Sequence, residues 1–121
     1  MNNNIKEITN LEMALGQSDA VVKYHDPNRG NFCGTFQNSK NCMFEVLTKN
    51  NQKYWISQAY YYKNILGLPI ISYDVITVYD DTNNVISQAE KWKKGYKKLR
   101  NLFNATESLY QKQEASKNPV R

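Results

Sequence analysis

Six basic residues lie within ten positions near the C-terminus, and contact with phosphate is the chemistry that they could perform. They are Lys91, Lys93, Lys94, Lys97, Lys98 and Arg100, within the sequence KWKKGYKKLR. No Asp or Glu occurs between Lys91 and Asn104, whereas a surface that serves only solubility usually mixes the two signs. Contacts of this kind with phosphate are independent of base sequence and sensitive to salt. We therefore expect these residues to bind nucleic acid, with a merely solvated helix face as the alternative.

A second candidate surface is the tyrosine-rich segment QAYYYKNILGLP. Three adjacent tyrosines on a strand cannot all point into the core, because successive side chains alternate between the two faces. Aromatic side chains exposed on a sheet stack on bases while nearby cations hold the backbone of a single strand. We therefore add Tyr60, Tyr62 and Lys63 to the predicted nucleic-acid-binding residues.

The same segment also fits a helix-turn-helix template, with SQAYYYKNIL as the first helix, Gly67 in the turn and ISYDVITV as the second helix. That second helix would be rich in β-branched residues and poor in polar side chains that could contact bases. The strand interpretation is therefore preferred.

Residues for catalysis or metal binding are few. His25 is the only histidine, and its neighbourhood with Cys33 matches no known nucleophile and base signature. Cys33 and Cys42 lack the CxxC spacing of zinc sites and are expected to be free thiols. The acids weighed for a nuclease are Glu45, Asp74, Asp80 and Asp81, of which the last two fall in a turn. No phosphate-binding glycine loop is present. We predict a protein that is not an enzyme, with no catalytic residue, cofactor or metal.

The basic residues would be positioned by a long amphipathic helix from Gln88 to Lys112. Its apolar stripe alternates steps of four and three residues and comprises Trp92, Tyr96, Leu99, Phe103, Thr106 and Tyr110. The stripe packs against the sheet, and the same spacing also suits a homodimer through this helix. Gly95 within it predicts a bend or the close approach of another group. Residues 113–121 are expected to form a disordered tail.

The rest of the chain predicts an α+β fold, namely an antiparallel meander of about five strands with a short N-terminal helix. The helix is indicated by Ile5, Ile8, Leu11 and Leu15 at helical spacing. Expected strands cover Ala20–Tyr24, Asn31–Phe36, Cys42–Thr48, Lys53–Gln58 and Pro69–Asp80, and the short run VIS after the DDTNN turn is a further candidate. Residues 1–112 are expected to form a single domain.

Length, charge and hydropathy limit the class of protein. The 121 residues carry a formal net charge of +5, which favours anionic partners. The chain has no secretory signal and no apolar run near the roughly 20 residues that span a bilayer, so a cytoplasmic location without membrane binding is expected. The leading interpretation is a small nucleic-acid-binding accessory or regulatory protein, encoded by a phage or mobile element and acting in the host cytoplasm. The alternative is an immunity protein or phage inhibitor of a host defence enzyme, whose basic helix binds an acidic protein surface.

Overall fold

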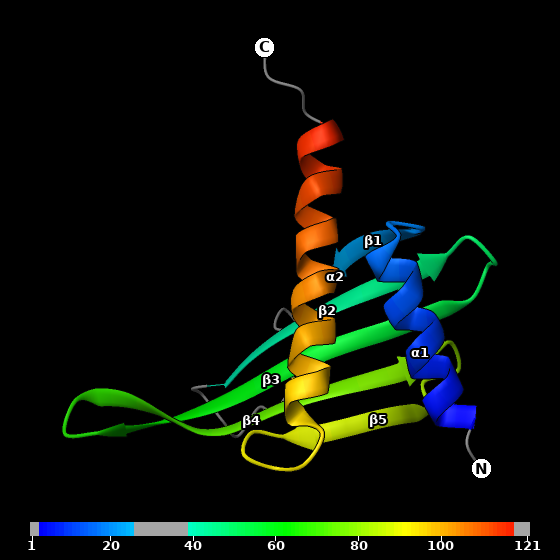
Figure 1. Ribbon diagram of the computed structural model, residues 1–121. Coiled ribbons are helices and arrows are strands. Elements are labelled where there is room, and N and C mark those ends of the chain that lie inside the picture. Colours follow the sequence, from blue (N-terminus) through cyan, green and yellow to red (C-terminus); the bar gives the residue numbers. More distant parts are fainter. Residues whose placement is uncertain (1–2, 26–38, 118–121) are drawn as a thin grey trace.

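The computed structural model describes residues 3–25 and 39–117, which form one antiparallel sheet with two helices on the same face (Figure 1). In chain order the elements are α1 (Asn3–Gly16), β1 (Ala20–His25), β2 (Ser39–Thr48), β3 (Lys53–Ile65), β4 (Leu68–Asp80), β5 (Val85–Glu90) and α2 (Tyr96–Lys117). The strand order β1-β2-β3-β4-β5 is a meander. The predicted α+β fold is therefore confirmed.

The sheet extends some of the predicted strands and includes the candidate strand that follows the DDTNN turn. The tyrosine-rich segment continues β3 as far as Ile65, so the helix-turn-helix interpretation is wrong. The fifth strand of the sheet is Val85–Glu90, which contains the VIS run. The predicted strand Asn31–Phe36 lies outside the described residues, as does Cys33.

The core lies between the two helices and one face of the sheet. Alternate residues of the central strands are fully buried there, because a strand directs every second side chain to the same face. They include Val46, Ile56, Ile76 and Val78. The α1 stripe buries Ile8, Leu11 and Leu15, while Ile5, which was expected with them, is exposed. The hydroxyl of Tyr54 donates to the carboxylate of Glu7 and so joins α1 to β3; burial raises the pKa of that hydroxyl.

Helix α2 begins at Tyr96, eight residues later than predicted. Residues 88–90 belong instead to β5, where Gln88 pairs with Thr77 and Ala89 with Ile76. Without this pairing, that part of β4 would have unpaired backbone N–H and C=O groups next to the core. Leaving such groups unpaired destabilises the fold, so residues 88–90 form a strand. The predicted helical stripe is correct for Leu99, Phe103 and Thr106, which are buried, together with Leu102 and Leu109. It is wrong for Trp92, which precedes the helix and is exposed.

The same helix also ends later than predicted, at Lys117 instead of Lys112. In this extension the side-chain amide of Gln113 donates to the backbone oxygen of Ala20 at 2.7 Å. Its oxygen accepts the backbone N–H of Val22 at 3.0 Å. Residues 113–117 are therefore not a disordered tail, and residues 118–121 lie outside the described range.

Candidate nucleic-acid interface

Five of the predicted basic residues lie in a short loop and the first helical turn that follows it. We call this segment the lysine loop, and its residues are Lys91, Lys93, Lys94, Gly95, Lys97 and Lys98, with Trp92 between the first two lysines. Backbone hydrogen bonds hold it in a tight path: Lys93 N–H donates to the oxygen of Glu90 at 3.0 Å, and Tyr96 N–H to the oxygen of Lys93 at 3.2 Å. The lysines are therefore carried by a structured turn that connects β5 to α2.

Gly95 separates this turn from the helix. Its φ of +89° lies in the left-handed region, which glycine adopts without steric penalty. The space around it is open, since a Cβ there would approach no closer than 4.0 Å to the nearest atom, on Ala89. The predicted close approach of another group is therefore wrong, and the glycine is needed for its backbone conformation.

The five lysines of the loop are exposed. Within the described ranges 3–25 and 39–117, no carboxylate forms an ion pair with any of them. The Nζ atom of Lys91 lies 5.3 Å from the centre of the Trp92 ring, a cation–π contact that leaves the other four ammonium groups to solvent. The loop is thus a compact cationic surface next to the N-terminus of a helix, where the helix dipole adds positive potential.

Trp92 lies between Lys91 and Lys93 in the lysine loop. It is 90% exposed, and its φ of +73° is a left-handed conformation that is rare for bulky residues. Backbone strain of this kind persists where the surrounding structure imposes it and is concentrated at functional sites. Trp92 was not among the predicted site residues, because helical periodicity assigned it to the core. The signal that could have identified it is Gly95, because a glycine at this place separates Trp92 from the helix that begins at Tyr96.

Arg100 does not belong to this surface, although it was predicted to face solvent beside the lysines. Its guanidinium donates to the Tyr96 hydroxyl at 2.7 Å and to the Gln58 side chain at 3.2 Å. It also lies 3.8 Å from the carboxylate of Asp74. Burial, and the hydrogen bond that Tyr96 donates to Asp74, raise the pKa of the Tyr96 hydroxyl against the opposing effect of Arg100. Arg100 therefore holds α2 against the sheet.

Asp74 connects this buried network to the lysine loop. Its side chain is 6% exposed and accepts hydrogen bonds from Gln58 at 3.0 Å and Tyr96 at 3.0 Å. Its backbone oxygen accepts the N–H of Lys91 at 2.9 Å, which fixes the first residue of the loop. Asp74, one of the four acids weighed for a nuclease, therefore makes buried structural contacts.

The predicted aromatic surface lies on β3. In the backbone register Tyr60 is opposite Asp74, while Tyr62 and Lys63 are opposite Ile71 and Ile70. The side chains of these three predicted site residues lie outside the described part of the structure. The register brings the Tyr60 backbone close to the lysine loop through Asp74, whereas Tyr62 and Lys63 lie farther along the hairpin.

A second polar cluster lies on the sheet face opposite the helices. His25, the last residue of β1, is 3.1 Å from the carboxylate of Glu45, which is also 3.5 Å from the Nζ of Lys53. The His25 ring packs against Trp55 with a centroid distance of 5.1 Å. Burial of Glu45 would raise the pKa of its carboxyl, but its contacts with His25 and Lys53 outweigh burial and lower that pKa from its ordinary value. This cluster joins three strands and accounts for the lone histidine through a structural contact.

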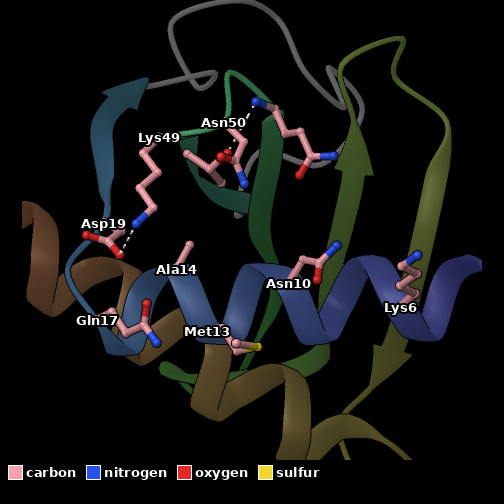
Figure 2. Close-up of a pocket in the computed structure, with 10 residues that line it drawn as sticks. Lys6, Asn10, Met13, Ala14, Gln17, Asp19, Lys49 and Asn50 are labelled. Atoms are coloured by element: carbon pink, nitrogen blue, oxygen red, sulfur yellow. Dashed lines mark hydrogen bonds and ion pairs between the residues drawn. The ribbon is translucent and has the colours of Figure 1, made fainter.

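A pocket of about 420 Å³ lies between α1 and the turn from β2 to β3, as Figure 2 shows. Amide and lysine side chains form most of its described lining, and Asp19, the one carboxylate there, is paired with Lys49 at 3.4 Å. Neither a histidine nor a cysteine is among those lining residues. In the described ranges as a whole, no group of three or more His, Cys, Asp or Glu residues is placed to hold a metal ion. No described helix is long and apolar enough to cross a membrane.

Comparison with known proteins provides no family: no protein-family model, no curated protein and no solved structure matches the chain.

Proposed function

We propose that this chain is a non-enzymatic nucleic-acid-binding protein that contacts phosphates through the lysine loop. The observation that carries the proposal is Trp92, 90% exposed and in a left-handed conformation, among five exposed lysines without ion-pair partners in the described ranges. Lysines supply the salt-dependent attraction to phosphates. An exposed aromatic ring next to them offers a face for a base or sugar.

The distribution of charge supports the same proposal. Three lysines elsewhere in the described ranges do have carboxylate partners, namely Lys49 with Asp19, Lys53 with Glu45 and Lys117 with Glu114. In the lysine loop the like charges are left unneutralised, and mutual repulsion disfavours that arrangement unless an anion binds. Lys91 is held by its backbone bond to Asp74 and Lys93 by its backbone bond to Glu90, so the surface is arranged before binding.

The test is a fluorescence-anisotropy titration with 20-nucleotide single strands and 20-base-pair duplexes of DNA and RNA, at about 50 mM and about 200 mM salt, where phosphate contacts differ greatly in strength. The quadruple variant with Lys93, Lys94, Lys97 and Lys98 changed to Ala is expected to lose affinity for every sequence. Its log–log salt slope should fall by about 3–4, because each phosphate contact contributes about one unit.

The matched control removes four exposed lysines elsewhere, by changing Lys23, Lys49, Lys112 and Lys117 to Ala. It alters net charge by the same amount and is expected to retain most of the salt slope. A second variant, Trp92→Asn, keeps a residue that tolerates the left-handed conformation and should weaken binding by about 5- to 100-fold through loss of stacking. If no nucleic acid binds at about 50 mM salt, or if both quadruple variants behave alike, the proposal fails. The acidic-protein alternative then takes its place.

A further inference from the structure

The hairpin of β3 and β4 extends beyond the rest of the sheet as a two-stranded arm (Figure 1). The first pair of β2 with β3 is Ser39 with Tyr61, and the last pair of β4 with β5 is Val75 with Glu90. Past Tyr61, four further pairs join β3 and β4, from Tyr62 with Ile71 to Ile65 with Leu68, and no other described strand pairs with this part of the hairpin. We call residues 62–71 the β-arm. At about 3.3 Å per residue it projects about 13 Å beyond β2.

The tip of the β-arm is apolar and strained. Leu66 has a φ of 53° and Gly67 a φ of 82°, which is the pattern of a two-residue type I′ turn. Asn-Gly is the pair that this turn favours, whereas the Cβ of a leucine in the left-handed region is sterically disfavoured. Leu66 is nevertheless present and 97% exposed, and Ile65 and Leu68 beside it are more than half exposed. Folding alone therefore gives no reason for a leucine at this position.

Leu66 and Trp92 share this unusual combination. The other non-glycine residues with positive φ are Ser18, Asn51 and Asn83, all small and polar, as expected for turns. Only Leu66 and Trp92 among the described residues with positive φ are large and apolar, and both are at least 90% exposed. Two strained turns thus present large apolar side chains to solvent.

The β-arm and the lysine loop lie at the same end of the sheet. β5 runs antiparallel to β4 and ends at Glu90, opposite Val75, so the loop begins near the base of the arm. Asp74, at that base, is paired with Tyr60 and accepts the backbone N–H of Lys91 at 2.9 Å. The buried contacts of Asp74 with Tyr96 and Gln58 make this junction rigid. A molecule bound by the lysines therefore lies next to the base of the arm.

We propose that the β-arm enters a groove of B-form DNA held by the lysine loop, and that Leu66 inserts between adjacent base pairs and bends the duplex. This proposal rests on the proposed function and specifies its substrate. The grooves of B-DNA are about 8 Å deep, less than the length of the arm, and β-ribbon proteins place strands in either the major or the minor groove. Leucine is among the apolar wedges that unstack base steps and kink duplexes by about 20–90°. The adjoining lysines supply the charge complementarity that directs the arm to DNA.

Double-stranded RNA does not fit this geometry, because its major groove is deep and too narrow for side chains to enter and its minor groove is wide and shallow. A single strand offers no stack of base pairs for the wedge to separate. The proposal therefore requires that duplex DNA is bound in preference to both, and that it is bent.

The test measures the bend directly, by energy transfer between dyes at the two ends of a 30-base-pair DNA duplex bound to the full chain. The key variant is Leu66→Asn, which removes the wedge and provides the residue that the type I′ turn favours. It is expected to fold with an equal or higher Tm. It should still bind the duplex, with affinity reduced by about 3- to 30-fold, and the increase in energy transfer should be lost. Met13→Asn, which removes an exposed apolar side chain from α1, is the control and should bend DNA as the parent does.

The outcomes separate the two proposals. Lysine-dependent binding without a bend, or with a bend that Leu66→Asn leaves unchanged, overturns the insertion of the arm and leaves the proposed function intact. If double-stranded RNA or single strands bind as tightly as duplex DNA or more tightly, duplex DNA is not the preferred substrate. That result also overturns the insertion of the arm and leaves the proposed function intact. Absence of binding to any nucleic acid overturns both proposals.

Discussion

Asp74 fixes the position at which the lysine loop begins. Its backbone oxygen holds the N–H of Lys91, while its buried carboxylate accepts hydrogen bonds from Gln58 and Tyr96 and lies near Arg100. A buried carboxylate is tolerated only when such partners replace its hydration. The same residue therefore supports the helix through its side chain, and the loop and the base of the β-arm through its backbone.

Replacing this residue by Asp74→Ala should lower the free energy of unfolding by about 3 kcal/mol, because it leaves Arg100 partly buried without a carboxylate and Gln58 with an unused donor. Urea denaturation monitored by circular dichroism measures the change. The control is Asp81→Ala, an exposed carboxylate in the turn from β4 to β5, which should change stability by less than about 0.5 kcal/mol. Equal effects of the two substitutions would show that the Asp74 network adds no net stability.

At the scale of elements, the last turns of α2 protect the edge of the sheet. β1 is the outermost strand on one side of the described sheet, and unpaired backbone groups on edge strands invite association with other chains. The Gln113 side chain bonds both the oxygen of Ala20 and the N–H of Val22, so it occupies the place of a neighbouring strand. The ring of Phe44 packs against Phe103 at 5.5 Å and Tyr110 at 5.5 Å, which holds the helix in register above this edge.

The substitution Gln113→Ala should therefore destabilise the fold by about 1–2 kcal/mol, since it removes two hydrogen bonds and leaves two backbone groups unpaired. Hydrogen exchange of the Val22 amide should accelerate at the same time. Gln111→Ala changes the same residue type at an exposed position two residues earlier and serves as the control. If the Val22 amide exchanges equally fast in both variants, Gln113 does not protect the edge.

At the scale of the whole molecule, the apolar stripe of α2 is used within the chain. Leu99, Phe103 and Leu109 are buried against the sheet, and Thr106 is fully buried. The predicted homodimer depended on this stripe as a coiled-coil seam, so its contact surface is already occupied. The net charge of +5 adds repulsion between two copies.

We therefore expect the free protein to be a monomer at micromolar concentration. Light scattering coupled to size-exclusion chromatography should give a mass near 14.1 kDa, independent of loading concentration. A mass of twice that value would contradict this expectation, and it would locate self-association on a surface other than the α2 stripe. Addition of duplex DNA should shift the elution, as required by the proposed function.

Local sequence patterns were sufficient for most of the elements. The β-branched and aromatic residues of Pro69–Asp80 predicted β4. The four-three spacing predicted that Leu99, Phe103 and Thr106 face the core. The helical prediction succeeded because the period of apolar residues on a helix follows from backbone geometry alone. The lysines of the loop were also identified from sequence, because a cluster of basic residues without acidic residues is visible in the sequence whatever the fold.

Tertiary structure decided the features that depend on contacts between distant residues. Helix α2 starts at Tyr96 because residues 88–90 pair with β4 as part of β5. The backbone hydrogen bonds of that pairing stabilise the fold more than an extension of the helix would. Arg100 points inward because β4 brings Asp74 to it from 26 positions away in the sequence. Trp92 and Leu66 are exposed because the tight turns that carry them have left-handed backbones. Helical periodicity uses only the residue types within one element. It therefore carries no information on the pairing of β5 with β4, which sets the start of α2, or on Asp74, which turns Arg100 inward.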